Sequence, residues 1–398
     1  MKRWKAQLKN WPLVADANAI IKARHVERAA AESYRYHQAE AERRNLKAFY
    51  GTELERAVRS RVADRARRLG WPKKQRQLHI FVTFCAHNWE TILATAFAPF
   101  GETTIFEWSS HGFCVGLSDW LDRRDSMNAA MLKAFHTANK RRPVDVVVGY
   151  FSGMTISPET LDEMARAGAV ITNFSFDDKQ PFPGKPIAGR YPTNAAIAGS
   201  VDLNLTSDPR GIVKYAVYGG LAMFHPEAAD PDLHRHHSTP FEFDVSFIGA
   251  NYGWRGKFVR ALIAKGINIA CFGPGWPSGP LPNEELSKVY SKSRINLGFG
   301  GIGYSRNLVN LKGRDFEVTM SGGLYLTQYN PELNLVYELG KEIVTYRDEE
   351  DCARIIRELI ANPELAAKIR EAGQKRAHKD HTYEMRWKNV LRVLGALD

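Results

Sequence analysis

Residues 243–273 read FDVSFIGANYGWRGKFVRALIAKGINIACFG and are the clearest indication of the type of fold. Two short apolar runs, 243–249 and 267–273, flank a segment, 254–265, that has the apolar spacing of a helix. Apolar strands that alternate with helices are typical of parallel sheets covered by helices on both faces. This stretch therefore predicts a strand–helix–strand unit of an α/β domain.

The alternation of strands and helices extends from this stretch in both directions. Further strands are expected at 78–84, 103–108, 144–150, 169–174, 201–207, 295–300, 323–328 and 342–347. Further helices are expected near 88–98, 127–140, 157–167, 283–292, 313–321, 350–360 and 363–378. We therefore predict an α/β fold with two Rossmann-like, doubly wound domains facing a cleft, where ligands bind beyond the carboxyl ends of the strands.

The stretch 225–241, HPEAADPDLHRHHSTPF, interrupts this alternation, because it is rich in Pro, His and Asp and has no periodicity. It marks the predicted boundary between an N-terminal Rossmann-like domain at 78–235 and a C-terminal one at 236–398. A basic helical arm at 1–77 precedes both domains. The His residues and the Asp230-Pro-Asp232 sequence in this stretch lack companion ligands at suitable spacing, so no metal site is predicted.

Positive charge is concentrated near the N-terminus. Residues 1–78 hold 20 Lys and Arg against 8 Asp and Glu, whereas the other 320 residues hold 35 against 36. Apolar residues from Leu46 to Leu69 recur at three- and four-residue spacing, which predicts an amphipathic helix that ends at Gly70-Trp71-Pro72. Two interpretations stay open: a helix packed on the next domain, or an arm that lies on anionic membrane or pairs with a partner helix. Nucleic acid is not an expected partner, because few aromatic residues accompany the basic ones.

The composition also indicates where the protein works. The 4 cysteines lie far apart, which is typical of reduced intracellular thiols rather than of a disulfide framework. No apolar run is long enough to span a bilayer, and the first residues lack the apolar core of a signal peptide. We expect a cytoplasmic protein, peripheral at the inner membrane face if the arm contacts lipid.

The segment 312–323, KGRDFEVTMSGG, carries the strongest candidate for ligand binding. A helix that starts near Gly313 puts Arg314 and Glu317 on one face, because they are three residues apart. A carboxylate such as Glu317 suits the two hydroxyls of a ribose, and Arg314 or Lys312 suits a diphosphate. The alternative is an ordinary ion pair on a surface helix.

A second candidate is the loop at 249–257, which follows an apolar strand and opens a helix. Glycines let the backbone approach a phosphate at the start of a helix, so Gly249 and Asn251 are binding candidates. Arg255 and Lys257 add positive charge. The alternative is a Gly-rich turn whose basic residues face solvent.

Two more glycine-rich loops follow predicted strands. In the first, the backbone at Gly273 and Gly275 and the aromatic edge of Trp276 could hold a base. The second, 298–303, matches GxGxxG but is not followed promptly by a helix. A dinucleotide site needs that helix, so this loop is not expected to bind one.

One ordered series of motifs resembles the spore-maturation-protein-B-like family of group 1 glycosyltransferases. The series runs FDVSFIGANYGWRGKF, GPGW, SKSRINLGFGG, LKGRDFEVTMSGG, EIVTYRDEEDC and His381-Thr382-Tyr383 with Arg386. The segment 143–178, which contains PVDVVVGYFSGMTISPETLDEM, is similar to the N-terminal domain of that family. The resemblance covers residues 78–398 and implies a GT-B fold.

The resemblance also implies that the two domains bind different substrates. A nucleoside-diphosphate sugar would bind the C-terminal domain, and the acceptor, a glycan, lipid-linked or protein acceptor, would bind mainly the N-terminal one. Glu317 falls at the family's ribose-binding Glu, and Arg255, six residues after Gly249, at the Lys or Arg that stabilises the departing diphosphate. The chain departs from the wider superfamily at Ala250, where many members have Arg, and at Val309, where they have a first Glu.

We therefore expect a metal-independent glycosyltransferase, with the sugar nucleotide as substrate and no further cofactor. Lys312 or Arg314 would supply the charge missing at position 250. The base for the acceptor hydroxyl would be His87, Asp177 or Asp178, which follow strands of the first domain. Two alternatives stay open: a non-catalytic nucleotide-binding or scaffold protein on the same fold, and a sugar-nucleotide epimerase.

Overall fold

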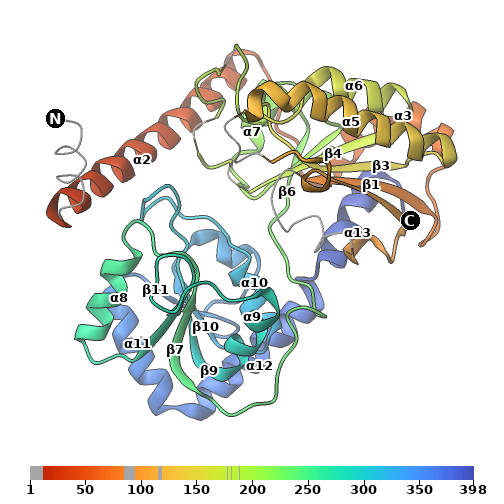
Figure 1. Ribbon diagram of the computed structural model, residues 1–398. Coiled ribbons are helices and arrows are strands. Elements are labelled where there is room, and N and C mark those ends of the chain that lie inside the picture. The colour runs from red at the N-terminus through yellow and green to blue at the C-terminus, as the bar shows by residue number, and fades with distance from the viewer. Residues whose placement is uncertain (1–11, 85–94, 115–118, 177, 181, 188) are drawn as a thin grey trace. The chain divides into compact units, whose positions relative to one another are not determined.

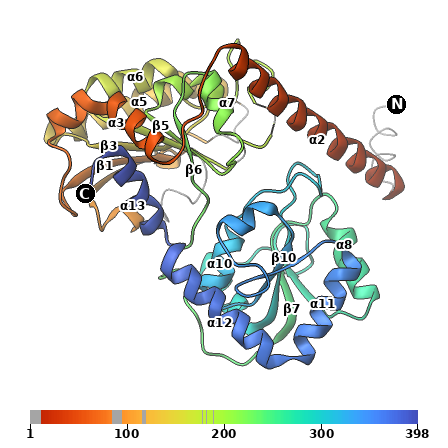
Figure 2. The ribbon, with the colours of Figure 1, turned by 180° about the vertical axis from the view of Figure 1, so that it is seen from behind.

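The computed structural model describes residues 12–84, 95–114, 119–176, 178–180, 182–187 and 189–398. The chain forms two compact units (Figures 1 and 2). The N-terminal unit joins 30–226 with 383–398, and the C-terminal unit joins 227–382 with the stretch up to Ala29. The boundary between the units therefore falls inside the first described helix, α2 (Pro12–Arg43).

The N-terminal unit is built on a parallel sheet of six strands in the order β2-β1-β3-β4-β5-β6. The strands are β1 (Leu78–Phe84), β2 (Gly101–Glu107), β3 (Val146–Tyr150), β4 (Val170–Ser175), β5 (Leu203–Thr206) and β6 (Ala222–Phe224). Every residue of β1, β4 and β5 is buried, because helices cover both faces of the sheet.

The helices of this unit are α3 (Gly51–Leu69), α5 (Trp120–Arg141), α6 (Pro158–Arg166), α7 (Ile212–Val217) and α13 (Tyr383–Leu394), with short 3₁₀ turns η1 (Ser109–His111), η2 (Asn194–Ala196) and η3 (Ala198–Ser200). On one face of the sheet, Phe135 of α5 packs against Phe81 of β1, with ring centroids 5.6 Å apart. On the other face, Trp387 of α13 packs near Phe174 of β4, at 6.1 Å.

Helix α3 is an integral part of the N-terminal unit. Leu54, Val58 and Val62, which belong to the predicted apolar stripe, are buried, and α3 packs against α13. The guanidinium of Arg65 forms an ion pair with Asp202, with one Nη1–Oδ2 distance of 2.7 Å. The apolar face of α3 is therefore buried within this unit, whereas an arm that lies on a membrane would need this face exposed.

The observed units differ from the predicted division at 77 and 235. Residues 30–77 pack with the first sheet, the change of unit falls at 226–227, and 383–398 return to the first unit. The difference arises because α3 and α13 bury apolar residues on the same sheet, which local sequence patterns cannot reveal.

The C-terminal unit is built on a parallel sheet of five strands in the order β11-β10-β9-β7-β8. The strands are β7 (Phe243–Ile248), β8 (Ile269–Phe272), β9 (Ser293–Gly298), β10 (Tyr325–Gln328) and β11 (Val344–Tyr346). The helices are α8 (Arg255–Ala264), α9 (Asn283–Lys292), α10 (Arg314–Met320), α11 (Glu349–Ala361) and α12 (Pro363–Asp380), with a 3₁₀ turn η4 (Pro331–Leu335). Helices α8, α11 and α12 share a core with β7, β9 and β10.

The order of this sheet reverses at β7. The chain passes from β7 to β8 on one side and then crosses to β9 on the other side. In sheets of this kind, the reversal leaves a crevice at the carboxyl ends of the two central strands. The segments that follow β7 and β9 are therefore where a ligand site is expected.

The structure confirms the predicted α/β fold with two Rossmann-like sheets, and every predicted strand is present to within a few residues. The sequence analysis missed β6, α7 and α13, of which β6 is only three residues long. Residues 88–94 of the helix expected at 88–98 lie outside the described residues. In the described part of the chain, no helix combines the length and the hydropathy needed to cross a bilayer.

Candidate functional site

The loop from β7 to α8 lies at the reversal point of the second sheet. Gly249 has a φ of 152°, which side-chain-bearing residues rarely adopt. A Cβ atom at this position would lie 3.0 Å from Nη1 of Arg314 and 3.0 Å from Cζ of Phe247. Glycine therefore lets the guanidinium of Arg314, from α10, lie directly against the backbone of this loop.

Two guanidinium groups meet beside this loop. Those of Arg255 and Arg314 lie 5.8 Å and 5.5 Å from the ring centroid of Phe247. Arg255 is the first residue of α8 and is only 4% exposed. Its guanidinium donates hydrogen bonds to the carbonyl of Ala250 at 3.0 Å and to the hydroxyl of Tyr252 at 3.2 Å.

Neither guanidinium group forms an ion pair within the described residues, although Glu317 and Asp315 lie near enough to raise the pKa of Arg314. Among the residues that the structure describes, no carboxylate lies within ion-pair distance of Arg255 or Arg314. The Nε atom of each is buried and has no hydrogen-bond partner there. Burial and, after it, the charge of Arg314 lower the pKa of Arg255 to about 10. Because an unsatisfied buried polar group costs about 1–3 kcal/mol, this pair favours an anion that would accept its hydrogen bonds.

Two carboxyl groups lie beside the start of α10. The hydroxyl of Tyr290 donates to Glu317 at 3.3 Å. A Cβ atom on Gly313 would lie 2.6 Å from Oε1 of Glu317 and 2.8 Å from Oε2 of Glu227, so both carboxyl groups approach this glycine. Burial raises the pKa of Glu227 to about 8, with Lys312 opposing and Glu317 adding to the rise. The carboxyl group of Glu227 therefore takes up a proton more readily than an exposed glutamate does.

The start of α10 is fixed by Asp315. This carboxylate accepts hydrogen bonds from the hydroxyl of Tyr325 at 2.7 Å and from the backbone N–H of Lys312 at 2.8 Å. Burial raises the pKa of Asp315 to about 6. The contact holds the first turn of α10 and so positions Arg314 and Glu317.

The loop at Gly273–Trp276 supports the β7 loop. The indole N–H of Trp276 donates to the carbonyl of Gly249 at 2.8 Å, and the backbone N–H of Asn251 donates to the carbonyl of Pro274 at 2.8 Å. The side-chain amide of Asn251 donates to the carbonyl of Gly275 at 3.2 Å. In this arrangement the polar groups predicted to hold a base or phosphate are engaged with one another, and they fix the shape of the loop.

Other predicted site residues lie elsewhere. Lys257 is exposed on α8 and lines a different cavity, because a spacing of two residues turns it away from Arg255. In the N-terminal unit, Asp178 is 5% exposed and accepts hydrogen bonds from Ser175 at 2.8 Å and Tyr215 at 2.6 Å. Both of its carboxylate oxygens are thus engaged. The remaining candidate bases, His87 and Asp177, lie outside the described residues.

The glycine-rich segment after β9 is a folded loop without a helix. Ile302 N–H donates to the carbonyl of Leu308 at 2.9 Å, and Gly301 and Val309 form an antiparallel bridge. Helix α10 begins only at Arg314. This loop therefore lacks the helix N-terminus that binds the pyrophosphate of a dinucleotide.

Comparisons with known proteins agree with the fold described above. A family model described as glycosyl transferase-like matches residues 255–392, which begin at Arg255 and include Arg314 and Glu317. Among solved structures, sucrose-phosphate synthase from Thermosynechococcus elongatus is similar, with a TM-score of 0.58 and 11% identity, over 79% of this chain and 98% of that one. HepE from Anabaena, solved with UDP, has a TM-score of 0.55 and 12% identity, over 81% of this chain and 100% of that one. No curated protein matches the sequence. The fold is that of the GT-B glycosyltransferases.

Sequence reasoning missed Glu227. This residue lies in the stretch 225–241, which was interpreted as a domain boundary, and no spacing rule links it to Glu317. Only the fold brings the two carboxyl groups to the same glycine. Arg255, in contrast, was predicted from its place in a loop after a strand, and Arg314 and Glu317 from their three-residue spacing on one predicted helix.

Proposed function

We propose that this chain transfers a sugar from a nucleoside-diphosphate sugar to an acceptor hydroxyl, without a metal ion. The observation that carries the proposal is the Arg255–Arg314 pair, which lies beside Gly249 without an ion-pair partner among the described residues. A diphosphate would accept hydrogen bonds from both guanidinium groups. Glu317, on the same helix as Arg314, would accept hydrogen bonds from the ribose hydroxyls.

The chemistry of sugar transfer needs this arrangement of charge. Cleavage of a glycosyl–phosphate bond makes the sugar cationic and leaves negative charge on the diphosphate. Fixed cations aimed at that diphosphate stabilise the transition state, because they need no reorganisation as the charge develops. Arg255 and Arg314 would supply the positive charge that a metal ion supplies in other transferases. The N–H groups of Gly249 and Asn251 donate to protein carbonyls, so side chains carry most of this task.

The acceptor is proposed to bind the N-terminal unit and to be a glycan, a lipid-linked saccharide or a protein. HepE, which has the same fold, was also solved in complex with UDP-glucose. That structure has a TM-score of 0.54 to this chain. That structure supports a nucleotide sugar as the donor class for this fold. His87 and Asp177 stay candidates for the base, whereas Asp178 would first have to release two hydrogen bonds.

Calorimetric titration with UDP, GDP and dTDP tests the donor site. We expect one of these to bind the wild type, and Arg255→Gln and Glu317→Gln to weaken binding about tenfold each, as expected for charge-assisted hydrogen bonds. Arg260→Gln is the matched control, since Arg260 is exposed on the same helix α8, and it should change the Kd less than about twofold.

A product assay then separates the alternatives. A transferase releases the nucleoside diphosphate from its sugar nucleotide when an acceptor is present. An epimerase converts the sugar nucleotide without this release. A protein that binds none of the three diphosphates, or binds one but never releases it from a donor, would be a scaffold and would contradict the proposal.

A further inference from the structure

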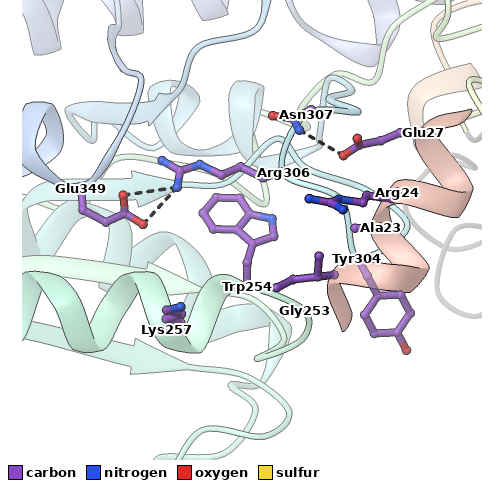
Figure 3. Close-up of a pocket in the computed structure, with 11 residues that line it drawn as sticks. Ala23, Arg24, Glu27, Gly253, Trp254, Lys257, Tyr304, Arg306, Asn307 and Glu349 are labelled. Atoms are coloured by element: carbon purple, nitrogen blue, oxygen red, sulfur yellow. Dashed lines mark hydrogen bonds and ion pairs between the residues drawn. The ribbon is translucent and has the colours of Figure 1, made fainter. Parts of the chain in front are cut away.

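The C-terminal unit has a cavity that is lined by none of the residues of the proposed donor site. Its volume is about 350 Å³, which is within the range of small-ligand sites. Its walls come from α2, the β7–α8 loop, α8, the loop after β9 and the start of α11 (Figure 3). Four separate segments of the chain therefore build it, because the β7–α8 loop and α8 are continuous.

The α2 wall is anchored to the loop after β9. The carboxylate of Glu27 accepts hydrogen bonds from the hydroxyl of Ser305 and from the side-chain amide of Asn307, the latter at 3.2 Å. A Cβ atom on Gly303 would lie 2.8 Å from Cγ1 of Val26, so helix and loop are in close contact. The cavity is thus a packed feature of this unit rather than a gap beside a loose helix.

The charges that line the cavity favour an anion. Arg306 is paired with Glu349 at 3.0 Å and 3.2 Å, and Glu27 is engaged by the loop. Arg24 and Lys257 face the cavity from α2 and α8 and form no ion pair within the described part of the chain. Two cations from different helices are therefore available to a negatively charged ligand.

The aromatic residues favour a saturated ring over a flat base. The guanidinium of Arg306 covers the ring of Trp254 at 5.2 Å, and the ammonium of Lys22 lies 5.2 Å from the ring centroid of Tyr304. A nucleobase would need an uncovered aromatic face for stacking. Figure 3 shows the indole of Trp254 between Arg306 and Arg24, and Ile20 adds a further apolar surface. A sugar needs no such face, because its hydroxyl groups can donate hydrogen bonds to the carboxylates of Glu27 and Glu349, which line the cavity.

We propose that this cavity binds an anionic saccharide, that is, a sugar unit with a carboxylate or a phosphate group. Arg24 and Lys257 contact the anionic group, and the carboxylates of Glu27 and Glu349 accept hydrogen bonds from the sugar hydroxyls. The inference rests on the cavity alone, so it does not depend on the proposed transfer reaction. It gives the N-terminal part of α2 a function in ligand recognition.

The test is direct binding to the full chain, followed by saturation-transfer NMR and calorimetry. The probes are glucuronate and glucose 6-phosphate, with glucose and AMP for comparison. We expect at least one acidic sugar to bind, and Arg24→Gln and Lys257→Gln to weaken it about fivefold to tenfold each. Arg35→Gln on α2 and Arg260→Gln on α8 lie outside the cavity and should leave the affinity unchanged.

Four results would overturn the proposal. They are no binding of either acidic sugar at millimolar concentration, equal binding of glucose, tighter binding of AMP, and loss of the bound sugar on saturation with UDP. The last result would assign the sugar to the donor site. Binding that survives both Glu317→Gln and excess UDP, and is lost in Arg24→Gln, supports a separate site even if no diphosphate is ever turned over.

Discussion

Gly249 shows how one missing side chain sets the geometry of the proposed donor site. Because Gly249 has no Cβ atom, there is room for Arg314. A Cβ atom there would lie only 3.0 Å from Nη1 of Arg314. Burial acts against the charge of both guanidinium groups beside the ring of Phe247, and it lowers the pKa of Arg255 to about 10. For Arg314, burial acts to lower the pKa, but Tyr325, Tyr290 and the acids of α10 raise it overall.

We predict that Gly249→Ala displaces Arg314 and weakens nucleoside-diphosphate binding about tenfold or more. The matched control is Gly266→Ala, because Gly266 also has a positive φ, 80°, but has nothing within 4 Å of its would-be Cβ. Each variant places a side chain at a positive φ, which costs about 1–3 kcal/mol, and thermal melts report this backbone cost separately from binding. Equal affinity in the two variants would show that Arg314 does not need this contact.

Glu227 predicts a pH dependence of stability in the C-terminal unit. Its folded pKa of about 8 lies above its ordinary value of 4.5, so the folded state holds an extra proton between these values. Stability should therefore fall as pH rises from about 4.5 to about 8, and Glu227 should contribute no further change above that. Glu227→Gln, which stays neutral, should flatten this slope in denaturant titrations at several pH values.

The control for this slope is Glu284→Gln, since Glu284 is exposed on α9. It should reproduce the wild-type pH profile. If Glu227→Gln has the wild-type slope as well, the carboxyl group is ionised in the folded protein, and the charges of Lys312 and Arg314 outweigh its burial.

At the scale of elements, α13 closes the aromatic core of the N-terminal unit. Trp387 is 1% exposed and lies 4.7 Å from Phe97 and 5.1 Å from His225, between ring centroids. Burial is the main cause that lowers the pKa of His225 to about 3, and the positive charge of Arg386 lowers it further. This side chain therefore stays neutral. A helix far along the chain thus completes a core formed by the first half.

We predict that Trp387→Ala destabilises the N-terminal unit by about 3–5 kcal/mol, the usual cost of deleting a buried large aromatic side chain. Hydrogen exchange should accelerate in β1 and β4, whereas β7 and β9 should keep their protection. Lys388→Ala, one residue further and exposed, is the control and should be nearly neutral. Unchanged exchange in β1 would mean that α13 is not needed by this sheet.

The sequence predicted the strands and helices better than it predicted which of them pack together. Strands such as 243–249 and 295–300 were found because their apolar runs are local signals. The packing of α3 on the first sheet and the return of α13 depend on contacts between residues far apart in the chain. For the same reason Arg255 and Glu317 could be proposed as candidates from local patterns, whereas Glu227 and the cavity at Arg24 could not be predicted.

At the scale of the whole molecule, both units are discontinuous in sequence. The N-terminal unit needs 383–394 from the far end of the chain, and the C-terminal unit includes the early part of α2 up to Ala29. Such a connectivity shapes how the protein emerges from the ribosome. Domains commonly fold in order as they are synthesised. Here the first sheet can gather its strands early, yet its aromatic core stays open until α13 has left the exit tunnel. The nascent chain would therefore expose apolar surface, a substrate for chaperones, throughout synthesis of the second sheet.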